Sequence, residues 1–482
     1  SPYYKLCGGA EIFFRKKSLF PDRPTHPAGI PMKNKNPLNL RKTRTLPYDL
    51  IKDKRYTVDK IFLHIPIIAN ARAGSQTRGF NTFFNKCARH YDGLNIIGLS
   101  RGERHLLYYV IINRNGDIIK HGSFNTITTP DGKTTDFHAL LEEKEKRRDA
   151  ARKDWGTIEG ISDLKKGYVS NIVHQISKLM IENDAVVALE ALDSGFKSSR
   201  CKIEKSIYQQ FEKALISKLN LLAFKDNAHG EIGSVTRAYQ LSAPFESFSK
   251  IYGQTGAIFY VNPAYTTTID PLTGFTPFIK VRYENIRKAK AFLKAFKCIR
   301  YNQQNDYFEF YADSDSFTDK NTGRDHWTIT THGDVRHWYN RQSGKYEKIN
   351  ITALLKAILA GGKIDYEDGS DIRDALCQAN DANFYKDVFC CLQILLSTRY
   401  YSNESGREAE YLVSPVMAAN GTFFDTRTAG DNLPQSLPCN SAYHIALKAK
   451  ALIETIDDEG KIDLKSSKNW LTYVQDRLEQ IQ

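Results

Sequence analysis

Apolar and polar positions divide the chain into a basic, turn-rich N-terminal stretch and a longer region of regular elements. Residues 3–15 alternate loosely around Gly8-Gly9, which predicts a strand with a turn. Residues 16–59 are rich in proline and basic side chains, so we expect a loop that lies on a polyanion. The apolar run at 60–68 predicts a further strand.

From residue 96 onward the pattern indicates an α/β domain. Tight links predict an antiparallel meander of three strands, at 96–99, 105–113 and 116–122. An apolar strand at 185–190 ends in a carboxylate, Glu190. Helices are predicted at 136–154, 163–182, 203–225 and 440–456. Asn440 or Ser441 is expected to cap the last helix. This order of elements favours a ribonuclease H-like α/β core that is split in sequence.

Composition and charge narrow the class of protein further. Hydrophobic residues make up 41% of the chain, as in globular proteins and unlike disordered ones. The net charge of +13 favours a polyanionic partner, and abundant Tyr and Phe suit base stacking. No run of ~18 apolar residues is present, so no membrane span is predicted. The cysteines form no CxxC pair, which argues against zinc and is typical of a cytoplasmic protein.

Ribonuclease H-type nucleases collect carboxylates from distant segments to hold two Mg²⁺ ions, which activate water and stabilise the leaving oxygen. Glu190 fits one of these positions, because a charge that closes a buried strand needs a partner or a metal. The alternative is a strand-end glutamate that faces solvent. The position expected on the first strand is Ser100, whose neutral hydroxyl is a weak Mg²⁺ ligand.

Three segments resemble the RuvC motifs of the type V-A CRISPR RNA-guided nucleases: IIGLSRGERHL (96–106), VVALEALDSGFK (186–197) and LPQSLPCNSAYHIALKA (433–449). The resemblance covers essentially the whole chain and implies the C-terminal half of such an effector. The implied fold is a split RuvC core with a partial β-rich Wedge segment and an α/β Nuc insert. The implied domains are the Wedge end (1–70), RuvC segments (71–137, 157–262 and 425–482), the bridge helix (138–156) and the Nuc domain (263–424).

The same resemblance implies a degenerate nuclease site. The family's catalytic aspartates fall on Ser100 and Pro438, its glutamate on Glu190 and its Nuc-domain arginine on Tyr401. Proline has no side-chain oxygen, and one glutamate cannot hold two Mg²⁺ ions. We therefore expect no Mg²⁺ at the RuvC site and no DNA cleavage there. The alternative is an active RNA-guided DNA endonuclease with relocated carboxylates, for which the candidates are Asp92, Glu103 and Asp425.

The N-terminal stretch resembles the family's Wedge segment, which processes the guide-RNA precursor without metal. The resemblance places the catalytic residues of this reaction at His26, Lys35 and Lys52. Cleavage by the 2′-hydroxyl of the RNA needs a proton acceptor and cations, so no cofactor is expected. The predicted supporting RNA-binding residues are Arg15, Lys16, Lys17, Lys54 and Arg55. Trp155 matches the tryptophan that anchors the bridge helix.

Full effectors of this family are more than twice as long, and the additional part resembles the REC lobe and the PAM-reading domain. The expected partner is guide (cr)RNA, and target DNA is expected only together with such an N-terminal half, which a separate protein chain could supply. Two functions follow. The chain is a nuclease-inactive protein that binds and processes guide RNA, or it is a truncated mimic that inhibits an intact effector by capturing guide RNA or the partner lobe.

Overall fold

A computed structural model divides the chain into two compact units. The first comprises Ser1–Ser75, Ala139–Lys166 and Asn220–Gln240, and the second comprises Gln76–His138, Gly167–Leu219 and Leu241–Gln482. The structure describes residues 3–6, 11–15, 27–33, 43–45, 59–64, 67–70, 77–101, 107–128, 132, 134–153, 162–191, 205–224, 226–234, 237–239, 241, 255–332, 335–340, 343–400, 411–463 and 469–481.

A five-stranded sheet in the order β13-β12-β7-β8-β9 lies in the second unit. Its strands are β7 (Asn95–Ser100), β8 (Tyr108–Ile112), β9 (Ile118–Ser123), β12 (Ala185–Glu190) and β13 (Ile258–Val261). The predicted antiparallel meander is present as β7-β8-β9, and β12 runs parallel to both β7 and β13. The mixed sheet with its helices confirms the ribonuclease H-like α/β fold.

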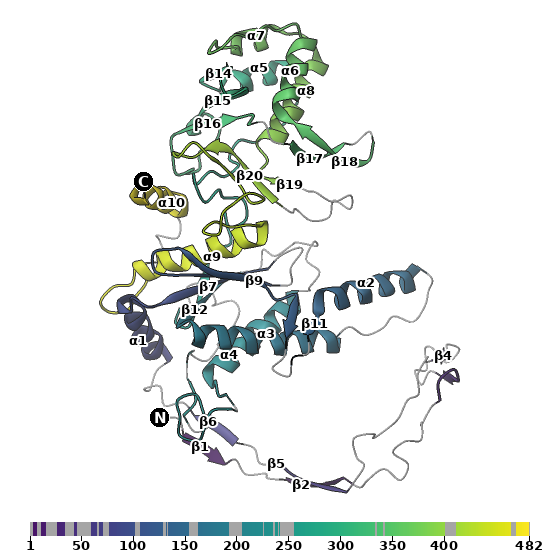
Figure 1. The fold of residues 1–482 in the computed structure, drawn as a ribbon, viewed down its shortest axis with the longest axis vertical. Coiled ribbons are helices and arrows are strands. Elements are labelled where there is room, and N and C mark those ends of the chain that lie inside the picture. The colour runs from purple at the N-terminus through teal and green to yellow at the C-terminus, as the bar shows by residue number, and fades with distance from the viewer. Residues whose placement is uncertain are drawn as a thin grey trace. The chain divides into compact units, whose positions relative to one another are not determined.

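Helices cover both faces of this sheet. Figure 1 shows α3 (Ser162–Glu182) and α4 (Lys205–Asn220) on one face and α9 (Leu437–Glu454) on the other. Gly98 permits the close approach of α9, because a Cβ atom there would overlap the carbonyl oxygen of Ala442 and lie 2.8 Å from the amide nitrogen of Ala446.

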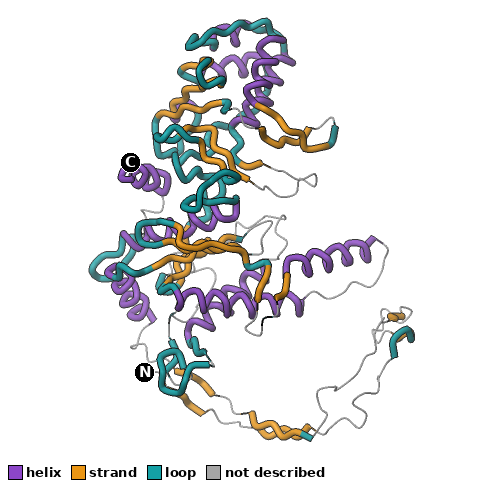
Figure 2. Tube along the Cα trace, viewed as in Figure 1, coloured by secondary structure: helices purple, strands orange, loops and turns teal. Residues whose placement is uncertain are grey.

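A second hydrophobic core in the same unit gathers buried residues between Phe275 and Val416, within the segment predicted as the Nuc insert. Figure 2 shows that this part of the molecule is built from both helices and strands. Its strands are β14 (Cys298–Asn302), β15 (Tyr307–Asp313), β16 (His326–Thr330), β17 (Val335–Asn340), β18 (Lys345–Asn350), β19 (Arg399–Tyr400), β20 (Tyr411–Met417) and β21 (Phe423–Asp425). Its helices are α5 (Ile286–Lys294), α6 (Ile351–Gly361), α7 (Arg373–Gln378) and α8 (Ala382–Leu395). Other elements of the second unit are α1 (Thr77–His90), β10 (Thr126–Thr128), β11 (Thr134–Asp136) and α10 (Trp470–Ile481). The helix α2 (Phe137–Lys153) begins in the second unit and continues into the first.

In the described part of the first unit, the strands form three two-stranded ladders. They are β1 (Tyr3–Leu6) with β6 (Ile67–Asn70), β2 (Glu11–Arg15) with β5 (Lys60–His64) and β3 (Pro31–Lys33) with β4 (Thr43–Thr45). The strand predicted at 3–15 is therefore two strands, and so is the one predicted at 60–68. β1 and β2 do not pair with each other. Each pairs with a strand beyond the basic stretch, between 45 and 67 residues later in the sequence.

The helix predicted at 440–456 begins three residues earlier than expected. Ser436 is its N-cap and accepts a hydrogen bond from the amide of Cys439 over 3.3 Å, which corrects the expected caps Asn440 and Ser441. Pro438 falls within the first turn, where a residue without an amide hydrogen costs no intrahelical bond. The helix predicted at 203–225 likewise ends earlier, at Asn220. Among the described residues, no helix has the length and hydropathy to cross a bilayer.

Candidate active site

Ser100 and Glu190 lie at the ends of two adjacent parallel strands. Leu99 of β7 pairs with Leu189 of β12, so the next residue on each strand reaches the same edge of the sheet. Alternation places both side chains on the α9 face, since Ile96 and Ala188 contribute to the core that α9 covers. Neighbouring strands are about 4.8 Å apart, so the sheet brings these two predicted site residues together.

The carboxylate of Glu190 has protein partners. The hydroxyl of Thr266, which is 3% exposed, donates a 2.7 Å hydrogen bond to its Oε1. Lys448 of α9 is close enough for the Glu190 charge to act on its pKa. A hydroxyl donor and a lysine thus supply part of the stabilisation that a metal ion gives to a strand-end carboxylate.

Neutral groups surround the start of α9, where the third carboxylate was expected. Tyr108, which pairs with Ser100, hydrogen-bonds through its hydroxyl to Ser436 and Cys439, and this hydroxyl lies 2.7 Å from Nδ1 of His121. Burial raises the pKa of Tyr108 and also that of Cys439, the latter to about 11, so both groups stay protonated at neutral pH. Pro438 sits between these residues in the first helical turn and offers no ligand atom.

On the opposite face of the sheet, Arg101 fixes the end of β12 to α4. Its guanidinium donates a 3.0 Å hydrogen bond to the backbone carbonyl of Glu190 and lies 3.6 Å from the carboxylate of Glu212. The same group lies over the ring of Tyr208, 4.9 Å from its centroid. Burial raises the pKa of Glu212, and Arg101 opposes that shift. Arg101 therefore holds the strand end in place and is committed to a buried ion pair.

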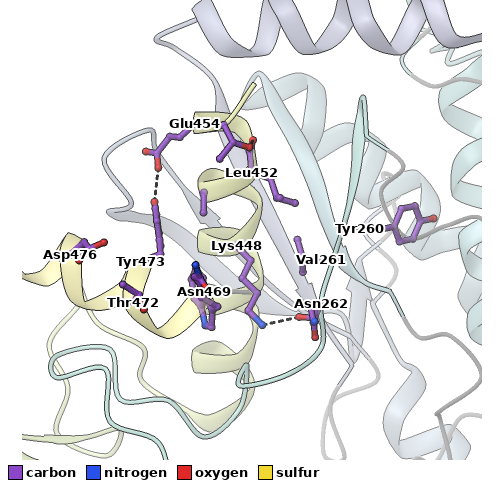
Figure 3. Close-up of a pocket in the computed structure, with 13 residues that line it drawn as sticks. Tyr260, Val261, Asn262, Lys448, Leu452, Glu454, Asn469, Thr472, Tyr473 and Asp476 are labelled. Carbon is purple, nitrogen blue, oxygen red and sulfur yellow. Dashed lines mark hydrogen bonds between the residues drawn. The ribbon is translucent and has the colours of Figure 1, made fainter. Parts of the chain in front are cut away.

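A cavity of about 290 Å³ lies beside the end of β13, between this strand, α9 and α10. Figure 3 shows Lys448 extending from α9 toward Asn262, to whose carbonyl it donates a hydrogen bond over 2.7 Å. Trp470 and Tyr473 of α10 also line the cavity. Lys448 also donates to the carbonyl of Ala264. Burial lowers the pKa of Lys448 to about 7, although Glu190 opposes the shift.

The residues at this edge do not fit a pair of Mg²⁺ ions. Ser100 supplies a hydroxyl that is 2% exposed, Glu190 is engaged by Thr266, and Pro438 has no oxygen to offer. Throughout the described part of the chain, no group of three or more His, Cys, Asp or Glu side chains is arranged to hold a metal ion.

Of the proposed replacement carboxylates that the structure describes, Asp92 is remote from this edge and Asp425 is already paired with an arginine. Asp92 lies in the turn before Asn95, at the opposite end of β7 from Ser100. Asp425 is 6% exposed and forms an ion pair with Arg427 at 2.5 Å. Glu103 lies outside the described residues.

A family match covers most of the chain. The model of the RuvC nuclease domain matches residues 75–479. The chain belongs to the RuvC nuclease domain family. The match includes both strand-end positions and α9, so Ser100, Glu190 and Pro438 are residues of a RuvC fold. Metal-dependent nuclease chemistry needs several carboxylates at this edge of the sheet. In this RuvC domain, hydroxyl, thiol and lysine groups lie around Glu190 instead.

Most of the other predicted site residues lie outside the part of the chain that the structure describes. These are His26, Lys35, Lys52, Tyr401, Lys16, Lys17, Lys54, Arg55 and Trp155. Arg15 ends β2, where its backbone pairs with Lys60. Their assigned roles, and the domain boundaries, remain predictions from the sequence.

Three residues of the RuvC edge were missed by sequence reasoning: Thr266, Lys448 and Tyr108. Thr266 is far from Glu190 in sequence, and no local pattern connects the two. Lys448 carried a weak signal, because a lysine between the apolar residues of a buried helix needs acceptors for its charge. Tyr108 belongs to a β-strand pattern that predicts core packing and gives no sign of its hydroxyl contacts.

Proposed function

We propose that this RuvC-domain protein is a type V-A CRISPR effector-like protein that binds guide (cr)RNA and does not cut DNA at its RuvC site. The observation that carries the loss of cutting is the set of groups at the sheet edge. Ser100 and Pro438 stand where metal-binding carboxylates are needed, and Glu190 is held by Thr266. Without paired carboxylates, two Mg²⁺ ions cannot be brought to a phosphodiester.

The proposed remaining chemistry is metal-independent cleavage of the guide-RNA precursor. His26 would accept the proton of the attacking 2′-hydroxyl, and Lys35 and Lys52 would stabilise the negative charge of the phosphorane. Arg15, Lys16, Lys17, Lys54 and Arg55 would contribute phosphate contacts whose affinity falls as salt rises. The support for this part is the sequence resemblance together with the net charge of +13.

Precursor RNA processing is tested with the full chain in EDTA. Labelled RNA that contains a type V-A repeat should give one defined product, and His26→Ala should abolish it while leaving RNA binding within about twofold. His229→Ala is the matched control, since His229 is an exposed histidine elsewhere in the chain. Absence of the product, or an equal loss in both variants, would contradict the processing claim.

DNA cleavage is tested separately, with the guide RNA and Mg²⁺ present. The proposal expects no degradation of single-stranded DNA above that of Glu190→Gln. Mg²⁺-dependent degradation that disappears in Glu190→Gln would instead establish the alternative of an active endonuclease. Target-DNA recognition is proposed to require an N-terminal REC and PAM-reading half, and the place of action is proposed to be the cytoplasm.

A further inference from the structure

The hairpin formed by β17 and β18 presents two different faces. On one face, Trp338 and Ile349 pack against the second hydrophobic core. Because side chains alternate along a strand, the other face carries His337, Tyr339 and, from β18, Tyr346 and Lys348. The hairpin is therefore anchored by its inner face, and its outer face holds aromatic and basic side chains.

The outer face is built from two directly opposed pairs. Tyr339 lies opposite Tyr346, with ring centroids 5.3 Å apart, and His337 lies opposite Lys348. Tyr339 is 46% exposed, and Lys348 is exposed as well. Two residues along a strand separate the pairs by about 7 Å, so a cation stands next to an aromatic platform.

Tyr411 of β20 and, beyond it, Arg427 lie beside His337. The hydroxyl of Tyr411 lies 3.3 Å from Nδ1 of His337 and accepts a hydrogen bond from its amide over 3.0 Å. The guanidinium of Arg427 lies over the ring of Tyr411, 4.2 Å from its centroid. Tyr411 is buried and Arg427 is ion-paired with Asp425, so these contacts fix the position of His337, and the ligand-binding surface consists of the two cross-strand pairs.

Glu347, the acidic residue of the hairpin, does not place its negative charge on the outer face. Glu347 projects from the inner side, where it accepts hydrogen bonds from Asn340 over 2.9 Å and from Ser343 over 2.6 Å. These bonds hold the pKa of Glu347 below its ordinary value and direct its charge toward the turn.

We propose that the outer face of hairpin β17–β18 is a stacking site for single-stranded nucleic acid. A base stacks on the exposed ring of Tyr339, the ring of Tyr346, tilted by 57° to it, supports that ring from the opposite strand, and the neighbouring phosphate meets Lys348. Aromatic platforms with an adjacent cation bind single strands with little regard to sequence, because every base has a flat face. This inference rests on the hairpin alone and is independent of the guide-RNA assignment.

The experiment measures binding of the full chain to fluorescent oligothymidylate and oligouridylate, which lack repeat sequence and secondary structure, across a salt series. Tyr339→Leu should weaken binding by about tenfold, and Tyr339→Phe, which keeps the ring, should bind as the wild type does. Phe83→Leu removes another exposed aromatic residue, on α1, and should have no effect.

The charge is tested by a matched pair on the same hairpin. Lys348→Gln should lower the salt dependence of log Kd by about 0.7, whereas Lys345→Gln, on the inner side, should leave it unchanged. Weakening by Tyr339→Leu with either oligonucleotide supports the site and identifies the strand that it prefers. The proposal is overturned if the wild type binds neither oligonucleotide or if Tyr339→Leu and Phe83→Leu bind with equal affinity. It is also overturned if Lys348→Gln and Lys345→Gln show the same salt dependence. Loss of processing by His26→Ala would not alter these measurements.

Discussion

Thr266 donates a hydrogen bond to Oε1 of Glu190 over 2.7 Å, from a loop that is 76 residues away in sequence. A strand-end carboxylate of a RuvC fold is thereby held by the protein itself. Lys448 lies on the same face and responds to the charge of Glu190. The carboxylate of Glu190 consequently interacts with protein groups, and what they contribute to stability can be measured without any ligand.

Loss of the Thr266 hydroxyl should destabilise the fold. We expect Thr266→Val to lower the free energy of unfolding by about 1.5–3 kcal/mol, because it removes a buried donor to a charged group. Thr266→Ser keeps the hydroxyl and should lose less than half as much. Urea unfolding of both variants checks this. An undiminished stability of Thr266→Val, which keeps a methyl group but has no hydroxyl, would mean that the hydrogen bond does not stabilise this edge.

The stability of the protein should rise with pH above neutrality because of Lys448. Its pKa is lowered to about 7 from an ordinary 10.5 by burial, so the unfolded chain binds a proton that the folded chain releases. The resulting penalty is complete below about pH 7 and fades as the pH rises toward 10.5, by up to about 1.4 kcal/mol per pH unit. The measurement is urea unfolding between neutral and mildly alkaline pH. Lys448→Met should lack this rise, and parallel profiles of the two proteins would refute the assignment.

Acid should destabilise the protein through His444, which is 1% exposed. Burial lowers its pKa to about 3, while the unfolded chain takes up a proton near pH 6.5. Stability that is complete above about pH 6.5 is therefore lost as the pH falls toward the folded pKa, by up to about 1.4 kcal/mol per pH unit. His444→Leu keeps an apolar side chain in the core of α9 and should flatten the difference between about pH 6.5 and 5. An unchanged acid limb in this variant would assign the effect to other groups.

The sequence was a good guide to the elements of the RuvC sheet and a poor one to its contacts. The meander and the position of Glu190 followed from apolar runs and short links, since local patterning determines pleated strands. The strand β13 was missed. The start of α9 was misplaced because Pro438 was considered only as a lost carboxylate and not as a first-turn residue behind the Ser436 cap. The partners of Glu190 could not be predicted, because Thr266 and Lys448 reach it only through tertiary packing.

The packing of α9 on the sheet should depend on Gly98. Its Cβ position would overlap the backbone of Ala442, and neither the helix nor the sheet can yield without moving other packed residues. We expect Gly98→Ala to cost more than about 3 kcal/mol of unfolding free energy, or to prevent folding. The control is Gly167→Ala in α3, where no atom lies within 4 Å of the new Cβ; it should stabilise the protein by up to about 1 kcal/mol. Near-equal stabilities of the two variants would contradict the close contact.

Restoring the lost carboxylates should create a Mg²⁺ response that the natural chain lacks. In the double variant Ser100→Asp with Pro438→Asp, two new carboxylates join Glu190 on the α9 face. Asp at position 438 is favourable at a helix N-terminus, whereas Asp at the buried position 100 is costly without a cation. We therefore expect the double variant to be less stable than the wild type in EDTA and to recover about 2–3 kcal/mol when Mg²⁺ is near a hundredfold above its Kd. The wild type should show no such gain, and adding Glu190→Gln to the double variant should abolish it. A Mg²⁺-dependent stabilisation of the wild type that Glu190→Gln removes would show instead that the natural edge still binds the ion, and it would reopen the question of DNA cleavage.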